Sequence, residues 1–343
     1  MSDEITLEIL DAGEEAAWDE FVHAQPAASF FHLSGWRGIL ESALGHKTYY
    51  FVAKQQNRIV GILPLVHIKS LLFGNNLSSL AFGAYGGPSA ENPAVLDLLN
   101  ERAVALGKEL RVGAVEFRLR EASGRQRPTK ELYERFVKPI LPSEDENMQA
   151  IRSKQRNVIR KGMKNGLELQ VGTVESFYDI YAESVRNLGT PVFPVSLFRQ
   201  MMTTFPESTE ILTVALDGEP ISSALVYYHG NEVCPYYWGG KFAARALKGN
   251  DVLAWKIMCR AAERGCTSFD FGRSKRDTGP YQWKLNLGFE PFQLYYEYEL
   301  IQETEMPSVN PLNPKYRLFI DTWKKLPLPL AKLIGPAVSR SLG

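Results

Sequence analysis

The chain has few cysteines and no long apolar run. Its three cysteines, Cys234, Cys259 and Cys266, form no CxxC pair. Such a set is typical of buried thiols in a reducing compartment, and it predicts neither a disulfide framework nor a metal site. No run of 18 apolar residues occurs, and residues 1–4 (MSDE) open no signal peptide. We therefore expect a cytoplasmic protein without a membrane span.

Net charge and most catalytic motifs are also missing. The charges of the 39 basic and 39 acidic residues cancel, so the chain has no net charge that would attract DNA. We therefore do not expect DNA as a partner. The chain lacks a GxSxG elbow, an HExxH pair, a Walker loop and a GxGxxG loop. Its five histidines are scattered, and no serine or cysteine nucleophile has a paired base near it in sequence. The remaining carboxylates, lysines, arginines and aromatics suit direct group transfer without a covalent enzyme intermediate.

One stretch, residues 236–289, has the pattern of a β-α-β unit. The aromatic run 236–240 (YYWGG) predicts a strand, and a basic loop separates it from a helix that begins near Asn250 and stops at Gly265. Residues 268–272 (SFDFG) predict the next strand, followed by the basic loop 273–276 (RSKR). Ligands bind at the carboxyl edge of such sheets, so we expect the site there.

The order of predicted elements occurs twice. Residues 85–87 (YGG) stand where 238–240 (WGG) stand later, and a helix and a strand follow each. Gly87 to Phe117 spans 30 positions and Gly240 to Phe271 spans 31. A chain of 343 residues is long enough for two domains. We predict two copies of one α/β unit with a mixed sheet.

Several segments carry a resemblance to a known family. They are residues 31–36 (FHLSGW), 85–88 (YGGP), 154–156 (KQR), 160–162 (RKG), 188–194 (LGTPVFP), 269–275 (FDFGRSK) and 278–281 (TGPY). With the meander that ends in the aromatic strand, they resemble the GNAT acyltransferase fold in tandem, as in FemAB-type transferases. The chain is most similar to the FemAB-related proteins found beside exosortase and exopolysaccharide genes.

The resemblance implies domain boundaries. It places an N-terminal GNAT-like domain at residues 1–143 and a C-terminal GNAT-like domain of the BioF2-like acetyltransferase type at 144–303. It also implies that a tail, residues 304–343, packs back on the first domain.

The resemblance further implies an acyl- or aminoacyltransferase that acts on an amine or hydroxyl of a cell-envelope or exopolysaccharide precursor. The precursor is a small molecule or a lipid-linked saccharide, and no cofactor is expected beyond the acyl donor. Aminoacyl-tRNA and acyl-CoA both stay open as donors. Residues 245–250 (RALKGN) depart from the Q/R-x-x-G-x-G/A loop of acetyl-CoA enzymes. Two alternatives are an acyl-CoA-dependent N-acetyltransferase and a non-catalytic GNAT-fold adaptor in polysaccharide export.

Three residues are predicted to be catalytic. Lys284 follows an aromatic residue, as a lysine does in Fem-like transferases, and would stabilise an oxyanion; the alternative is a surface lysine on a short helix. Asp270, at a strand end, would orient the acceptor or take its proton, or else form an ion pair with Arg273. Tyr281 would protonate the leaving group, or else pack at the start of a helix.

Further residues are predicted to bind substrate. Arg273 and Lys275 would hold phosphate, or else belong to a solvated loop. Arg156 and Arg160, one helical turn apart on a basic helix, would form a second clamp, or else lie on a solvated helix face. The resemblance adds the aromatic and glycine positions Trp36, Trp238 and Gly239.

The last stretch mixes lysines, leucines and a tryptophan between residues 323 and 334. This pattern fits peripheral contact with the inner face of a membrane. A terminal helix packed on the first domain is the alternative, because Pro327 and Pro329 interrupt the pattern.

Overall fold

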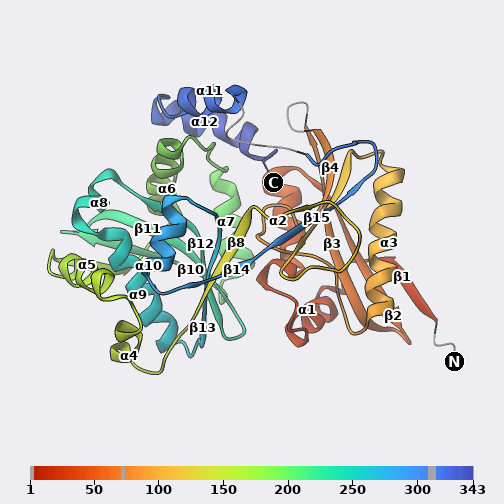
Figure 1. Cartoon of the computed structure of the whole chain (residues 1–343), viewed down its shortest axis with the longest axis horizontal. Coiled ribbons are helices and arrows are strands. Elements are labelled where there is room, and N and C mark those ends of the chain that lie inside the picture. The colour runs from red at the N-terminus through yellow and green to blue at the C-terminus, as the bar shows by residue number, and fades with distance from the viewer. Residues whose placement is uncertain (1–3, 71–73, 308–313, 343) are drawn as a thin grey trace. The chain divides into compact units, whose positions relative to one another are not determined.

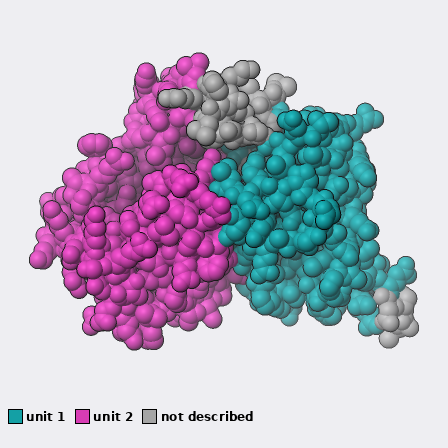
Figure 2. All heavy atoms as spheres, in the orientation of Figure 1, with its two compact units in different colours: residues 1–132, 293–309, 340–343 teal, residues 133–292, 310–339 magenta. Residues whose placement is uncertain are grey.

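The computed structural model describes residues 4–70, 74–307 and 314–342, and it forms two compact units. The first comprises residues 1–132, 293–309 and 340–343, and the second comprises residues 133–292 and 310–339 (Figure 2). Each unit contains one mixed sheet with helices packed on it (Figure 1). The predicted α/β class with two copies is therefore confirmed.

The first unit has the sheet order β1-β2-β3-β4-β6-β15-β7, and β5 pairs with β3. Its strands are β1 (Ile5–Ile9), β2 (Lys47–Gln55), β3 (Arg58–Ser70), β4 (Gly74–Ser79), β5 (Ser89–Ala90), β6 (Ala114–Leu119), β7 (Thr129–Lys130) and β15 (Tyr295–Leu300). Its helices are α1 (Glu15–Ala24), the 3-10 turn η1 (Phe30–His32), α2 (Gly35–Leu44) and α3 (Pro93–Glu109).

The second unit has the order β14-β8-β13-β12-β11-β10-β9. Its strands are β8 (Tyr133–Pro139), β9 (Leu167–Val171), β10 (Thr209–Leu216), β11 (Glu219–His229), β12 (Glu232–Gly240), β13 (Ser268–Lys275) and β14 (Glu290–Gln293). Its helices are α4 (Glu144–Gln149), α5 (Ser153–Met163), α6 (Val174–Leu188), α7 (Val195–Thr204), α8 (Phe242–Leu247), α9 (Gly249–Glu263), α10 (Gly279–Asn286), α11 (Pro314–Trp323) and α12 (Leu328–Ser339).

The two sheets exchange one strand each. In the first sheet β15 lies between β6 and β7, although it comes from the end of the second copy. In the second sheet β8 lies at the same place, between β13 and β14, although it precedes the second copy. The last strand of each copy thus completes the sheet of the other.

This exchange corrects the predicted boundaries at 143 and 303. Residues 133–139 belong to the second sheet and residues 295–300 to the first. Of the predicted tail, residues 304–307 and 340–342 belong to the first unit, whereas α11 and α12 belong to the second, where α12 packs against α6. Residues 308–313 of the predicted tail lie outside the described residues.

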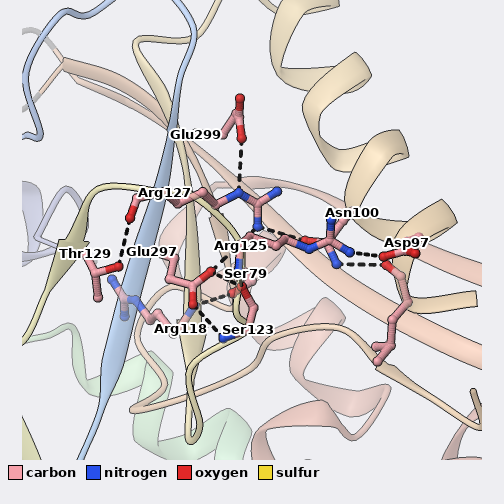
Figure 3. Close-up of polar contacts among 11 residues, drawn as sticks. Ser79, Asp97, Asn100, Arg118, Ser123, Arg125, Arg127, Thr129, Glu297 and Glu299 are labelled. Carbon is pink, nitrogen blue, oxygen red and sulfur yellow. Dashed lines mark hydrogen bonds and ion pairs between the residues drawn. The ribbon is translucent and has the colours of Figure 1, made fainter. Parts of the chain in front are cut away.

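A polar network holds the exchanged strand β15 in the first unit (Figure 3). The buried carboxylate of Glu297 accepts hydrogen bonds from the backbone N–H and the hydroxyl of Ser123, at 2.7 and 2.5 Å. Arg127 donates to Glu299 at 3.0 Å and to Asn100 of α3 at 2.9 Å. Residues of three segments distant in sequence are therefore joined on this strand.

The second unit buries side chains on both faces of its sheet. On one face α9 covers an apolar core that includes Phe136, Val226 and Phe269. On the other, α6 and α7 bring Tyr181 and Phe198 against Tyr237, with ring centroids 5.9 and 5.1 Å from it. Successive side chains along a strand thus point alternately to the apolar core under α9 and to the aromatic cluster under α6 and α7.

Asn250, predicted as the N-cap of helix α9, lies inside the helix, which begins at Gly249. The residue before it, Lys248, is in the left-handed conformation (φ 63°), so Asn250 is not the N-cap. The Asn250 Oδ1 atom instead accepts hydrogen bonds from Ser222 at 2.6 Å and from Trp238 at 3.2 Å. The predicted stop at Gly265 is confirmed by its φ of +78°.

Candidate active site

The neighbouring strands β12 and β13 separate near their middle. They run parallel, and within these fully described strands the pairing is confined to Glu232 with Ser268 and Val233 with Phe269. Beyond these pairs β12 continues to Gly240 and β13 to Lys275. Their carboxyl halves therefore do not pair with each other, and they lie at the edge where α/β sheets bind ligands.

A bulge follows directly in β13. Against β8, Asp270 lies opposite Val137 but Arg273 lies opposite Arg135, so β13 contains one extra residue. Gly272 provides the required left-handed backbone, with φ +64°. Its N–H donates to Asp270 Oδ1 at 2.8 Å. The bulge is therefore partly held by the carboxylate predicted to be catalytic.

Lys284 holds the same bulge from α10. Its ammonium donates to the carbonyl oxygens of Phe271, Gly272 and Arg273, at 2.6, 3.2 and 3.3 Å. It also lies 5.2 Å from the ring centroid of Phe136. Burial lowers the pKa of Lys284 to about 8, and the charge of Asp270 partly opposes this shift.

This geometry disagrees with the prediction that Lys284 stabilises an oxyanion. An ammonium has three N–H donors, and here three backbone carbonyls accept from it. None is left for an oxyanion in this conformation. The structure instead gives Lys284 a positioning role, in which it shapes the backbone beside Asp270. The alternative of a surface lysine is wrong, because the side chain is buried.

Asp270 lies on the face of the sheet that α6 covers. Phe136 and Phe269 belong to the core under α9, so Arg135 and Asp270, which alternate with them, point the other way. Asp270 is fully buried, and its Oδ2 atom lies 3.8 Å from an Nη atom of Arg135. Asp270 thus has an ion-pair partner, Arg135 of the neighbouring strand, and the alternative pair with Arg273 stays a prediction.

Two predicted phosphate-binding cations share one aromatic support. The guanidinium of Arg273 lies 4.6 Å from the ring centroid of Tyr133, and the ammonium of Lys275 lies 5.8 Å from it. Tyr133 and Arg135 both belong to β8. The exchanged strand therefore brings one more cation and an aromatic ring to the predicted pair.

Tyr237 contributes a polar group that the sequence analysis did not assign. Its hydroxyl is buried and has no hydrogen-bond partner in the structure. Burial raises the pKa of Tyr237 well above its usual value, whereas the charge of Arg273 acts in the opposite direction. The residue lies on β12 beyond its pairing with β13 and faces α6. The sequence feature that could have indicated Tyr237 is its position in the predicted aromatic strand YYWGG.

Tyr281 has a different environment from the one expected of an acid. Its hydroxyl donates to Glu134 Oε2 at 2.7 Å, and this hydrogen bond raises the pKa of Tyr281. Its ring lies edge-on to that of Phe136, with centroids 4.9 Å apart. These contacts favour the packing alternative, in which Tyr281 fastens α10 to β8.

Three predicted substrate-binding residues have structural contacts instead. Trp36 is 1% exposed and donates to the carbonyl of Phe30 at 3.1 Å, so its contacts are those of a core residue and its role in binding stays a prediction. A Cβ at Gly239 would lie 2.7 Å from Tyr181 Cα, so the glycine allows the close approach of α6. Trp238 packs against Phe271 and Trp283, with centroids 5.5 and 5.7 Å away.

The second predicted clamp lies on α5. Arg156 donates to the carbonyl of Gln149 at 2.9 Å, whereas Arg160 is exposed one turn later. Residues 150–166 contain six cations and no acidic residue. The clamp prediction stays a prediction.

The site has no metal-binding arrangement. Among the described residues, no group of three or more His, Cys, Asp or Glu side chains is placed to hold a metal ion. The three cysteines are buried free thiols, as predicted.

Comparison with known proteins identifies the fold class. Residues 153–285 match the family described as "Acetyltransferase (GNAT) domain". The crystal structure of FemX is 14% identical, with a TM-score of 0.68 over 92% of this chain and 100% of that chain. The match to L-PGS from Bacillus licheniformis has 12% identity and a TM-score of 0.56, over 92% of this chain and 100% of that one.

A tandem GNAT protein from the clavulanic acid biosynthesis pathway is 14% identical, with a TM-score of 0.55 over 86% of this chain and 98% of that one. No curated protein matches the chain by sequence. The structure is therefore a tandem arrangement of two GNAT-like domains with an acyltransferase-like fold. Residues 153–285 are the part that matches the acetyltransferase family.

Proposed function

We propose that the second unit transfers an acyl or aminoacyl group directly to an amine or hydroxyl of a cell-envelope or exopolysaccharide precursor. One observation carries this proposal: Asp270, a fully buried carboxylate, lies where β12 and β13 separate, on the face that also receives the unpartnered hydroxyl of Tyr237. A carboxylate, a hydroxyl and nearby cations provide for proton transfer and for binding of an anionic substrate.

The proposed reaction is a single displacement. The acceptor nitrogen or oxygen loses its proton to Asp270 and bonds to the acyl carbon. The ester C–O or thioester C–S bond of the donor breaks, and the leaving atom takes a proton from solvent. Tyr237 is positioned to donate a hydrogen bond to the reacting carbonyl, and Arg135 and Arg273 to attract phosphate groups of a substrate.

The name of one protein with a similar fold supports aminoacyl transfer. A C-terminal domain of a putative lysylphosphatidylglycerol synthetase from Agrobacterium fabrum has a TM-score of 0.52 and 12% identity, over 83% of this chain and 92% of that one. The product in that name is a lysyl ester of a phospholipid. We propose an aminoacyl donor such as aminoacyl-tRNA first, and a lipid-linked or small saccharide as acceptor.

Acyl-CoA-dependent N-acetylation is the second candidate, because residues 153–285 match an acetyltransferase family. The start of α9 argues against it. Gly249 is buried, and a Cβ there would lie 3.0 Å from Ile221 and 3.3 Å from Ala244 of α8. A short helix thus adjoins the helix start that holds pyrophosphate in other proteins.

The test is complementation of a deletion strain with the wild-type chain or with Asp270→Asn, followed by mass spectrometry of the envelope polymers. We expect an acyl mass to be lost on deletion and restored by the wild-type chain alone. Asparagine keeps the acceptor for the Gly272 N–H, so the variant should fold. Restoration by Asp270→Asn would instead support the non-catalytic adaptor.

Calorimetric titration with CoA, acetyl-CoA and UDP-sugars separates the two donor classes. Tight binding of CoA would favour the N-acetyltransferase. Absence of CoA binding, together with label transfer from aminoacyl-tRNA to an envelope precursor, is the expected result.

A further inference from the structure

Helix α12 exposes apolar side chains that an ordinary surface helix would bury. Leu330, Leu333 and Ile334 are 41%, 76% and 37% exposed, and they follow the i, i+3, i+4 spacing of one helical face. A surface helix normally turns such a face to the core and its polar residues to water. Here the apolar face, hereafter the outer stripe, points to solvent.

The orientation of α12 is fixed by its other face. Ala331, Gly335 and Ser339 are buried at i, i+4 and i+8. A Cβ at Gly335 would lie 2.8 Å from Val192 Cγ1 and 3.0 Å from the Val192 backbone nitrogen. Small residues therefore allow close packing on the second unit, and the larger side chains of the outer stripe have no room on that side.

Further contacts hold the two terminal helices on the second unit (Figure 1). Lys332 of α12 pairs with Asp179 of α6 at 2.5 Å, and Arg186 donates to the carbonyl of Leu326 at 3.0 Å. Trp323, at the end of α11, is buried. The outer stripe thus belongs to an anchored surface of the folded unit.

Neighbouring residues extend this surface with apolar area and positive charge. Leu318 of α11 is 71% exposed. Lys324 and Lys325, between α11 and α12, are exposed. Residues 323–343 contain three lysines, one arginine and no acidic residue. The nearest acidic residue of α11 is Asp321, and the exposed Lys324 and Lys325 outnumber it. Exposed leucines beside exposed lysines are the combination that binds the surface of an anionic bilayer.

We propose that α12, with the end of α11, docks this protein on an anionic lipid surface. Helix α12 has 12 residues, and among the described residues no helix is long and apolar enough to cross a bilayer, so it would lie in the interface. A second copy is a poorer occupant, because a symmetric contact of this face with itself would bring like charges together. The inference does not depend on the proposed function.

The test is co-sedimentation of the full chain with phosphatidylcholine vesicles, with or without phosphatidylglycerol. We expect binding to the anionic vesicles that falls as salt rises. The triple variant Leu330→Ser, Leu333→Ser, Ile334→Ser should lower the partition coefficient by roughly tenfold or more, because three apolar side chains no longer enter the interface. The pair Lys324→Glu, Lys325→Glu should also lower it by about tenfold.

A matched control is Val171→Ser, which removes another exposed apolar side chain, at the end of β9. It should bind as the wild type does. Circular dichroism should show that all variants keep their fold, since the replaced side chains are exposed. Failure of the wild type to bind, or equal binding by the triple variant, would overturn the proposal. A wild-type dimer that the triple variant converts to a monomer, seen by light scattering, would overturn it in favour of self-association.

Discussion

Tyr237 places a phenol hydroxyl in the aromatic interior of the second unit without a hydrogen-bond partner. A buried unsatisfied polar group costs roughly 1–3 kcal/mol of stability. Such a cost at the point where β12 and β13 separate is consistent with a group reserved for a substrate. The residue therefore offers a test in which stability and activity should move in opposite directions.

We expect Tyr237→Phe to keep or raise the thermal midpoint and to lower kcat/KM by at least about tenfold, since one charge-stabilising donor is lost. Calorimetry and initial rates on the envelope substrate measure both. Tyr227→Phe is the control, because that hydroxyl already donates to Met201 Sδ at 3.2 Å. Full activity of Tyr237→Phe would remove this residue from the site.

Lys284 allows its two possible roles to be separated. If it shapes the bulge, Lys284→Met leaves three carbonyls without their donor, and the loss should be about 1–3 kcal/mol of unfolding free energy together with reduced activity. If it stabilises an oxyanion, kcat should fall by roughly 10²–10³ with stability intact. Chemical denaturation and kcat of the same variant distinguish the two roles. We expect the loss of unfolding free energy together with reduced activity. An unchanged unfolding free energy would contradict it.

The buried lysines also predict a pH dependence of stability. Burial lowers the pKa of Lys138 and of Lys284 to about 8, from 10.5. Between pH 8 and 10.5 the unfolded chain binds more protons than the folded chain, so the unfolding free energy should rise with pH in that window. Below pH 8 both states are protonated, and these two groups add no slope.

Denaturation curves at pH 7.5, 8.5 and 9.5 measure this slope for the wild type and for Lys138→Met. The variant should show a smaller rise, by up to about 1.4 kcal/mol per pH unit. Comparing the two chains removes contributions from tyrosines and cysteines. Equal slopes would show that Lys138 keeps an ordinary pKa in the folded chain.

At the scale of single elements, the sequence predicts strands and helices well but not the site they build. The periodicity of apolar residues and the positions of glycines depend only on neighbours in the sequence. The strands β12 and β13 and the end of α9 therefore lie close to their predicted places. The bulge at Gly272 depends on the register of β13 against β8, where Asp270 and Arg273 lie opposite Val137 and Arg135, far away in the sequence. The contacts of Asp270 with Arg135 and of Tyr281 with Glu134 depend on the same pairing, so no local pattern could have predicted them.

Helix α5 carries the remaining binding prediction. Replacing Arg156 and Arg160 by Glu should raise KM by well over tenfold, since a charge-assisted hydrogen bond contributes about 1.5–3 kcal/mol. Arg160→Glu alone should produce most of the effect, because Arg156 is partly engaged with Gln149. Lys69→Glu, an exposed change in β3, controls for net charge. An unchanged KM at low salt would refute the clamp.

For the whole molecule, the strand exchange is the feature that sequence patterns could not reveal. A strand pattern at residues 133–139 shows that a strand forms, yet it does not show which sheet accepts it. Duplication predicts that each copy contains a complete sheet, and the structure shows that each copy lacks its last strand and receives that of the other. The predicted boundary at residue 143 assumes a complete sheet in each copy. It lies inside the second unit, which begins at residue 133.

The exchange predicts how fragments of the chain should behave. A fragment of residues 133–343 contains every strand of the second sheet, whereas one of residues 144–343 lacks β8, an interior strand between β13 and β14. Strand β8 contributes Phe136, which is fully buried, and pairs with β13 at both ends of the bulge. Loss of one buried phenylalanine alone costs about 3–5 kcal/mol, against a total stability of about 5–15 kcal/mol for a domain.

We therefore expect the longer fragment to unfold cooperatively in denaturant and the shorter one to lack a cooperative transition. Circular dichroism and the dispersion of amide proton shifts measure this. Adding a synthetic peptide of residues 130–142 to the shorter fragment should restore the transition, because the strand would pair from outside the chain. A cooperative transition of the shorter fragment, at the same denaturant midpoint without peptide, would show that the second sheet does not need the exchanged strand.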